Sequence, residues 1–320
     1  DDTDQYTYFN IIDTPGHIDF TSEVQRSMRV LDGAVVVFDG VAGVEPQTET
    51  NWRYAAEGNV PRLCFINKLD RTGASFQSSY EKIRNRLSND AIAIQLPWGE
   101  EENMHGVIDL IEMKAYTFDG EMGRDMAAHE IPAEYQEAAT NARAEMIEKI
   151  VENDEDLMEA YIGGEEPDKA TLKTTLRKAV IANQVFPVMC GTALKNKGVQ
   201  LVLDAVVDYL PSPMDLPPAK GIHPDTGEEL TREASNDEPL AALVFKLQID
   251  PFVGQLAFFR VYSGKIKAGD TVYNATNGTK ERVGRMVRLQ ADKREDAEEV
   301  QAGDIAAFVG MKDVKIGHSI

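Results

Sequence analysis

Apolar runs and helical patterns alternate over the first ninety residues. Residues 6–12, 34–38 and 63–66 are short runs rich in β-branched and aromatic side chains, which predict strands. Apolar side chains at helical spacing predict helices between and after these runs, at Phe20, Val24, Met28 and Leu31, from Pro46 to Gly58, and at Phe76, Tyr80, Ile83 and Leu87. Continuously apolar strands are typical of a mostly parallel sheet covered on both faces. We therefore expect an α/β domain.

This alternation is interrupted near residue 90. An extended stretch is followed by an acidic, helix-rich segment from about residue 133 to 182. The strand signal returns at 185–190, and helical spacing returns at 198–210. We therefore expect an α/β domain made of residues 1–89 and 184–212, into which residues 90–183 are inserted as an α+β subdomain.

A cluster of four prolines in PSPMDLPPA marks the next boundary, because proline is excluded from a helix interior. Residues 213–220 are the expected linker. From 221 to 320, short alternating runs are separated by turn residues, which predicts an all-β barrel or sandwich.

Composition restricts where the protein works and what it binds. No apolar run approaches the roughly 18 residues of a membrane span. The only cysteines, Cys64 and Cys190, lie in apolar runs, so we expect buried free thiols and a reducing compartment such as the cytoplasm. A net charge of −21 argues against broad electrostatic attachment to nucleic acid, so any RNA contact should be local.

The negative charge is concentrated in the expected insertion. Residues 90–183 carry 22 acidic and 8 basic side chains, which gives −14 of the total of −21. This imbalance favours a basic partner, although a solvated acidic surface that maintains solubility explains it equally well.

Three short motifs follow predicted strands. Asp13-Thr14-Pro15-Gly16-His17 follows the first strand, and on its own such a turn is weak evidence for any function. Asn67-Lys68-Leu69-Asp70 follows the strand at 63–66, and Gly191-Thr192-Ala193-Leu194 follows the strand at 185–190. In open α/β sheets, ligands bind at the carboxyl ends of strands, so the last two motifs are expected to share one site.

The chemistry of these two motifs suits a guanine base. A carboxylate such as Asp70 can accept hydrogen bonds from guanine N1–H and N2–H₂ together, which adenine cannot reciprocate. The Lys68 stem can cover the ring, while the Asn67 amide can fasten neighbouring loops or reach base nitrogens. Backbone N–H groups of the small residues after the strand at 185–190 can approach guanine O6.

DTPGH, NKLD and the TAL turn resemble the switch and guanine-recognition motifs of translational GTPases. The runs VLDGAVVVFDGVAGVEPQTET, CGTALKNKGVQ and DPFVGQLAFFRVYSG resemble elongation factor G in particular, over essentially the whole chain. The resemblance implies a P-loop NTPase-like domain with an inserted subdomain, followed by a β-barrel. Thr192 stands where this family usually has serine, and either hydroxyl can serve.

The resemblance also implies residue roles. Asp13 would hold Mg²⁺ through water, the Gly16 N–H would sense the γ-phosphate, and His17 would orient the attacking water. The pocket for GTP or GDP would comprise Asn67, Lys68, Asp70, Thr192, Ala193 and Leu194. The reaction implied is phosphoryl transfer from GTP to water, assisted by positioning and electrostatics.

No G-x-x-x-x-G-K-[ST] motif occurs in the sequence, so the phosphate-binding loop is missing. We therefore expect an internal fragment that lacks this loop and the C-terminal domains, and we expect that the 320 residues alone do not hydrolyse GTP. For the parent protein, the resemblance implies movement of tRNA and mRNA through the ribosome. The insertion would contact the large-subunit stalk protein, while the barrel and the switch loop would contact ribosomal RNA.

Two alternatives stay open. One is a related ribosome-associated GTPase for recycling or ribosomal protection, and the other is a truncated ribosome-binding module that does not turn over nucleotide. The source compartment is equally open between cytoplasm and an organellar matrix.

Overall fold

A computed structural model describes residues 7–14, 18–290 and 293–320. Its contacts divide the chain into two compact units. The sheet unit is Asp32–Pro211, and the β unit combines the chain up to Leu31 with Ser212–Ile320. The contacts thus group the start of the chain with the β unit, whereas the sequence-based division kept residues 1–89 together, and the domain boundaries stay a prediction.

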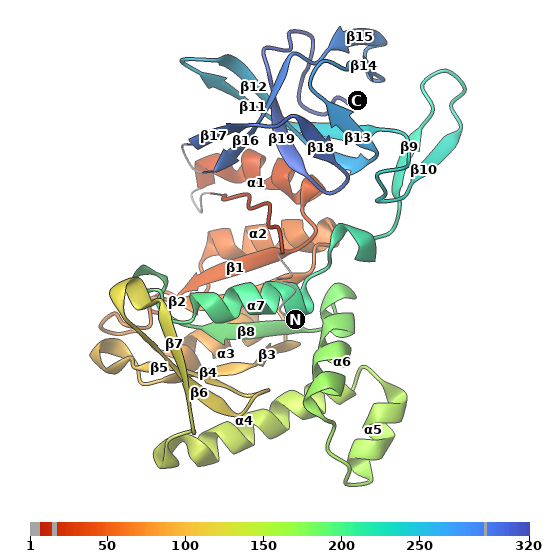
Figure 1. The fold of residues 1–320 in the computed structure, drawn as a ribbon. Coiled ribbons are helices and arrows are strands. Elements are labelled where there is room, and N and C mark those ends of the chain that lie inside the picture. Colours follow the sequence, from red (N-terminus) through yellow and green to blue (C-terminus); the bar gives the residue numbers. More distant parts are fainter. Residues whose placement is uncertain (1–6, 15–17, 291–292) are drawn as a thin grey trace, which may run out of the picture. The chain divides into compact units, whose positions relative to one another are not determined.

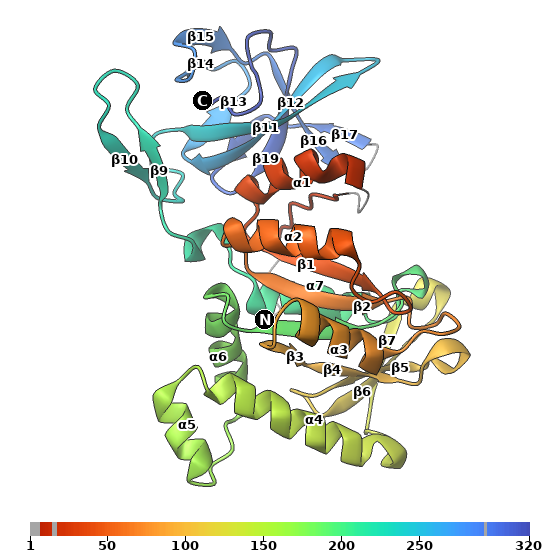
Figure 2. The same cartoon turned by 180° about the vertical axis from the view of Figure 1, so that it is seen from behind.

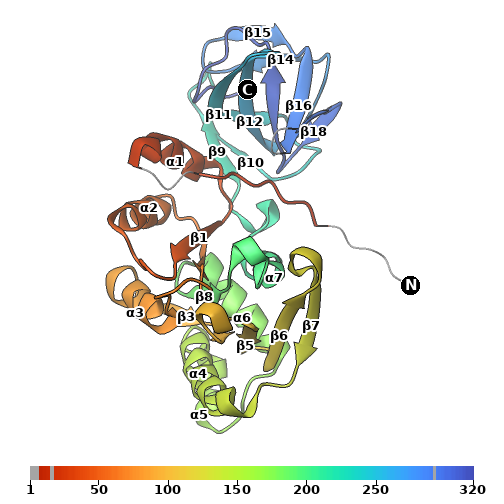
Figure 3. The ribbon, with the colours of Figure 1, turned by 90° about the vertical axis from the view of Figure 1, so that its left-hand side faces the viewer.

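A parallel sheet forms the centre of the sheet unit. Its strands are β1 (Ala34–Asp39), β2 (Arg62–Asn67), β8 (Phe186–Cys190) and β3 (Ala91–Ala93), in the order β1-β2-β8-β3 (Figure 1). Helices α2 (Pro46–Glu57) and α3 (Phe76–Arg86) cover one face, and α7 (Val199–Tyr209) covers the other (Figures 2 and 3). The predicted parallel α/β architecture is confirmed.

Local sequence signals fix the helices that flank the sheet. Helix α2 begins with Pro46 and a capping box between Glu45 and Thr48, while the Ser75 hydroxyl caps α3 by accepting a hydrogen bond from Ser78 N–H. Strands β2, β3 and β8 are almost completely buried and form one apolar core with the helices, while the edge strand β1 is fully buried only at Phe38. The carboxyl ends of the strands are therefore held by a rigid framework.

The segment from residue 95 to 181 packs onto this core. It contains an antiparallel sheet, β4 (Gln95–Trp98), β5 (Gly106–Asp109), β6 (Lys114–Asp119) and β7 (Asp125–His129), and the helices α4 (Ala133–Val151), α5 (Glu155–Ile162) and α6 (Lys169–Ile181). Strand β3 lies within the segment expected as the insertion, yet it pairs with β8 in the main sheet. The main sheet therefore reaches past residue 90.

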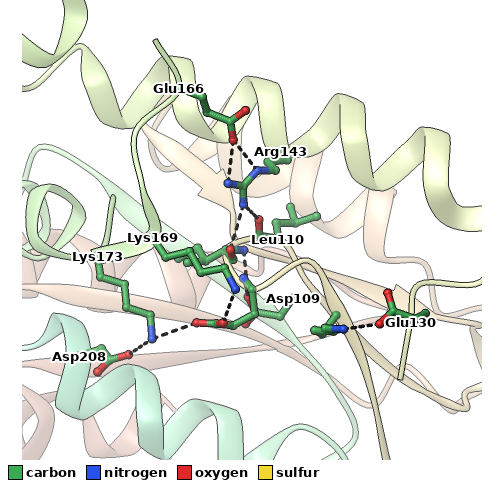
Figure 4. A network of polar contacts seen from close by, with 11 residues as sticks. Asp109, Leu110, Glu130, Arg143, Glu166, Lys169, Lys173 and Asp208 are labelled. Atoms are coloured by element: carbon green, nitrogen blue, oxygen red, sulfur yellow. Dashed lines mark hydrogen bonds and ion pairs between the residues drawn. The ribbon is translucent and has the colours of Figure 1, made fainter. Parts of the chain in front are cut away.

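Ion pairs fasten this segment to the rest of the sheet unit (Figure 4). Glu112 pairs with Lys169 and Lys173 of α6, and Lys173 also pairs with Asp208 of α7. Arg143 of α4 donates hydrogen bonds to the carbonyl oxygens of Leu110 and Ile111 and pairs with Glu166. The antiparallel sheet, the acidic helices and α7 are thus one connected body.

The β unit is built from antiparallel strands. A five-stranded sheet has the order β11-β12-β19-β16-β17, and the remaining strands form three two-stranded sheets, β9 with β10, β13 with β18, and β14 with β15. The strands are β9 (Ala219–Ile222), β10 (Glu229–Arg232), β11 (Ala241–Asp250), β12 (Gly254–Ser263), β13 (Lys265–Lys267), β14 (Thr271–Asn274), β15 (Thr279–Arg282), β16 (Arg285–Gln290), β17 (Lys293–Asp296), β18 (Glu299–Gln301) and β19 (Ile305–Val309). The predicted all-β region is confirmed.

Short helical segments complete the chain. Helix α1 (Thr21–Ser27) lies between the 3₁₀ turns Ile18–Phe20 and Met28–Val30, as the spacing from Phe20 to Leu31 predicts. Further 3₁₀ turns are Glu101–Asn103, Glu121–Gly123, Ala193–Lys195 and Pro213–Asp215. In the described part of the chain, no helix is both long and apolar enough to cross a membrane.

The strand predicted over residues 6–12 is not observed in its described part. Residues 7–14 have no regular secondary structure, and Tyr8 and Ile11 are exposed. A strand is stable only when a neighbour takes up its backbone hydrogen bonds, and none of the described strands pairs with this run. The β-branched composition of this run was therefore misleading.

Candidate functional site

Three loops meet at the carboxyl edge of the parallel sheet. They follow β1 at Asp39, β2 at Asn67–Asp70 and β8 at Gly191–Lys195. Because β1, β2 and β8 are parallel neighbours, the ends of these strands lie side by side. Polar side chains from distant parts of the sequence are thereby brought together.

Asn67 joins two of these loops. Its Oδ1 accepts hydrogen bonds from Lys68 N–H and from Ala193 N–H, both at 2.8 Å. Gly191 permits the close approach, since a Cβ there would lie 2.3 Å from the Lys197 carbonyl oxygen. The two loops are consequently locked in one relative position by an amide side chain and by a backbone that has no room for a side chain.

Asp70 is the less exposed of the two carboxylates at this edge. Its Oδ1 accepts a hydrogen bond from Thr192 Oγ1 at 2.7 Å, and its Oδ2 pairs with Lys195 Nζ at 2.8 Å. Thr192 is only 1% exposed, and the Asp70 side chain is 15% exposed. Burial acts to raise the pKa of Asp70, but the hydrogen bonds from Lys195 and Thr192 outweigh it and hold the pKa below its ordinary value. Asp70 is therefore ionised at neutral pH.

Lys68 is held in an unusual conformation. Its φ of +64° lies in the left-handed region, which few residues other than glycine adopt. Its Nζ donates a hydrogen bond to Asp39 Oδ2 at 2.7 Å, while Asp39 Oδ1 accepts from Val41 N–H and Ala42 N–H. The hydrogen bond from Lys68 is the main reason that the pKa of Asp39 falls to about 2. This ion pair connects the loop after β2 to the loop after β1.

Comparison with known proteins assigns the chain to a family. Residues 3–212, more than half of the chain, match the family model of the elongation factor Tu GTP binding domain. The chain belongs to this family. Residues 239–320 match a second model, elongation factor G domain 2. Both models describe domains of translation elongation factors, so the chain belongs to the translational GTPase family, whose GTP-binding domain implies a guanine nucleotide as ligand.

A solved structure supports the same architecture. The crystal structure of ttk003000868 from Thermus thermophilus is similar over 96% of this chain, with a TM-score of 0.80 and a sequence identity of 29%. The chain spans 43% of the length of that protein. A parallel-sheet GTP-binding domain followed by a β-rich domain is therefore the shared fold.

The structure brings together one group of the predicted site residues. Asn67, Lys68, Asp70 and the turn Thr192-Ala193-Leu194 lie at the carboxyl edge of the GTP-binding domain's sheet. Asp13 belongs to the β unit, where it is exposed on chain without regular secondary structure. Gly16 and His17, the other two residues of the predicted switch, lie outside the described residues.

Sequence patterns missed two residues at this edge of the GTP-binding domain. Asp39 directly follows the apolar run at 34–38 and was not singled out, although a carboxylate beside the other loops could have been inferred from the sheet order. Lys195 follows the TAL turn directly, and the only signal was its position three residues after Thr192. Both are charged partners of predicted residues.

The backbone donors of the Thr192–Leu194 turn are not equivalent. Ala193 N–H is already bonded to Asn67, so it is not free for a ligand in this state. Among the described residues, no hydrogen bond takes up the N–H of Leu194, whose side chain is exposed. Leu194 therefore carries the open donor of this turn.

No ready-made metal centre exists in the described ranges. No group of three or more His, Cys, Asp or Glu side chains within 7–14, 18–290 and 293–320 is arranged to hold an ion. A magnesium ion bound with a nucleotide needs less, because it keeps several waters and uses one or two carboxylates together with phosphate oxygens. Asp13, the residue predicted to hold Mg²⁺ through water, is exposed.

Proposed function

We propose that the carboxyl edge of the sheet recognises the guanine base of GTP or GDP. The observation that carries this proposal is the ionised Asp70 carboxylate, whose position is fixed by a hydrogen bond from the buried Thr192 hydroxyl. Guanine presents N1–H and N2–H₂ as adjacent donors, which suit the two oxygens of one carboxylate. Adenine presents an acceptor at N1 and is repelled by the same group.

The remaining edge residues complete the proposed base pocket. The open N–H of Leu194 would donate to guanine O6, because Ala193 N–H is used by Asn67. Lys68 would cover the ring with its stem while Asp39 holds its ammonium group. Asn67 would act by keeping the loops after β2 and β8 together.

We further propose that the complete protein hydrolyses GTP. Asp13 would hold Mg²⁺ through water, Gly16 N–H would sense the γ-phosphate, and His17 would orient the attacking water. When bound, Mg²⁺ supplies neutralisation of the phosphate charge. Since the sequence contains no phosphate-binding loop, the 320 residues alone should show no hydrolysis.

The biological role we propose is that of elongation factor G, which couples GTP hydrolysis to movement of tRNA and mRNA in translation. The match of residues 239–320 to elongation factor G domain 2 supports this choice over other translational GTPases. A recycling or protection factor, and a ribosome-binding module without turnover, are the competing proposals.

The acidic helices α4 and α5 provide a surface through which the protein would bind the ribosome. Exposed acidic side chains follow α4 and α5, at Glu134, Glu137, Glu145, Glu148, Glu152, Glu155, Asp156 and Glu159. Such a surface suits a basic partner, which we propose to be the large-subunit stalk protein. Support for RNA at the β unit is weaker, because Arg285 and Arg288 pair with Asp296 and Asp304.

Base specificity is the direct test. In the full-length protein, Asp70→Asn should weaken GDP binding by about tenfold to a hundredfold. The substitution replaces one carboxylate oxygen, which accepts from guanine, by an NH₂ group, which can only donate. The same change should strengthen binding of xanthosine diphosphate, whose C2 carbonyl accepts from the new amide. Asp156→Asn on α5 is the matched control and should leave both affinities unchanged. Equal binding of GDP and ADP by the unmodified protein would reject the base pocket.

A further inference from the structure

The two partners of Asp70 differ in how firmly they are held. Thr192 is buried, and its backbone is fixed to Lys197 by hydrogen bonds in both directions. The Lys195 side chain is 55% exposed, although its backbone is fixed in the same turn by a hydrogen bond from Lys195 N–H to Thr192 O at 3.2 Å. The ammonium group can therefore leave Asp70 while the turn stays in place.

A neighbouring turn adds to the rigidity of this backbone. Gly123 lies against it so closely that a Cβ there would come within 2.6 Å of the Lys195 carbonyl oxygen. The Gly123 carbonyl in turn accepts a hydrogen bond from Gln200 Nε2 of α7 at 2.8 Å. The Lys195 backbone is thus hydrogen-bonded within its turn and packed against Gly123, whereas its side chain is 55% exposed.

We propose that Lys195 is a built-in competitor for the base, which neutralises Asp70 in the nucleotide-free state and is displaced from it by guanine. This inference rests on the proposed function of the edge. Guanine needs both carboxylate oxygens, yet only 15% of the Asp70 side chain is exposed while Lys195 is in place. Thr192 cannot withdraw because it is buried, so Lys195 is the group that yields.

The competition should be weak but measurable. A partly exposed ion pair contributes little free energy, so its loss should cost guanine about twofold to fivefold in affinity. In return, Lys195 keeps the second oxygen of the largely covered Asp70 carboxylate hydrogen-bonded when no nucleotide is bound, while Thr192 holds the first. Lys195 would therefore determine specificity as well as affinity.

Hypoxanthine separates these two effects. It has the N1–H of guanine but lacks the 2-amino group, so it uses one oxygen of Asp70 and can leave Lys195 on the other. Inosine diphosphate then escapes the displacement cost that guanosine diphosphate bears. Lys195 should narrow the difference in affinity between these two nucleotides.

The test is calorimetric titration of the nucleotide-free, full-length protein with GDP and with inosine diphosphate. Lys195→Met should bind GDP about twofold to fivefold more tightly and inosine diphosphate no more tightly, so the ratio of the two affinities rises by the same factor. Lys195→Arg should behave as the unmodified protein, because arginine restores the ion pair. Lys178→Met, at an exposed lysine of α6, is the matched control and should change neither affinity.

Each other result has a definite meaning. If Lys195→Met binds GDP with unchanged or reduced affinity, Lys195 does not compete with the base and the inference is wrong. If the gain is equal for both nucleotides, Lys195 acts on a shared part of the nucleotide and the inference is again wrong. If the unmodified protein shows no preference for GDP over ADP, the proposed base pocket itself fails, which the first two results would not imply.

Discussion

The ion pair between Asp39 and Lys68 offers a quantitative test of how the edge is held together. Asp39→Asn removes the charge but keeps an oxygen that can accept from Val41 N–H and Ala42 N–H. A pKa that falls from 3.8 to about 2 corresponds to about 2 kcal/mol of stabilisation by linkage. Because Lys68 is 41% exposed, we discount this to about 1 kcal/mol at pH 7.

The pH dependence has a defined sign. The pKa of Asp39 is lower in the folded state, so its contribution to the free energy of unfolding is fully present above about pH 4 and is lost as pH falls toward 2. At about pH 3, roughly half of it should remain. The difference between the unmodified protein and Asp39→Asn should therefore shrink from about 1 kcal/mol to about 0.5 kcal/mol between pH 7 and pH 3.

Urea unfolding followed by tryptophan fluorescence measures this difference. The only tryptophans, Trp52 and Trp98, both lie in the sheet unit, so their emission reports on the unit that contains the ion pair. Asp90→Asn is the matched control, because Asp90 pairs with Lys149 at 3.2 Å and its carboxylate is 49% exposed against 23% for Asp39, so the change should cost less than about 0.5 kcal/mol. A loss for Asp39→Asn that is as large at pH 3 as at pH 7 would refute the electrostatic explanation.

Two further changes probe the packing of the same loops. Thr192→Val removes the donor to Asp70 while keeping the side-chain volume, so it should lower the free energy of unfolding by about 1–2 kcal/mol and weaken GDP binding in the full-length protein. In the same urea assay, the control Thr175→Val, at a buried threonine of α6, should cost less. Equal losses for the two variants would contradict the role of Asp70 as the acceptor of the Thr192 hydroxyl. Gly191→Ala would place a methyl group 2.3 Å from the Lys197 carbonyl oxygen and should lower the free energy of unfolding by more than about 2 kcal/mol. The control Gly58→Ala, whose Cβ would come no closer than 3.3 Å to any neighbour, should change it by less than about 1 kcal/mol. Similar urea midpoints for the two glycine variants would show that the loop after β8 relaxes easily.

The sequence predicted the meeting of Asn67 and Thr192 although 125 positions separate them. The reason is topological: two parallel strands place their carboxyl ends at one edge, so any residue just after either strand is confined to that edge. Helices α2 and α3 could also be predicted from the sequence, because Pro46, Gly58 and the spacing from Phe76 to Leu87 are local signals.

What the sequence could not predict depends on contacts that have no periodic pattern. The run at 6–12 has the composition of a strand, but strand formation requires a neighbour, and composition does not supply one. In the Thr192–Leu194 turn, three N–H groups were equivalent candidates for guanine O6. Only the structure shows that Asn67 already uses the one from Ala193.

The two carboxylates at the edge illustrate why position alone does not define a binding residue. Backbone N–H groups of Val41 and Ala42 hold one oxygen of Asp39, and Lys68 holds the other. Backbone N–H groups cannot rotate away as a side chain can, so this oxygen of Asp39 stays hydrogen-bonded within the protein and is not available to a ligand. At Asp70 no backbone N–H from another described residue is among the donors: the Thr192 hydroxyl holds Oδ1, and the partner of Oδ2 is Lys195, which is 55% exposed against 41% for Lys68. It follows that Asp39→Asn should leave the choice between GDP and xanthosine diphosphate unchanged, whereas Asp70→Asn should reverse it.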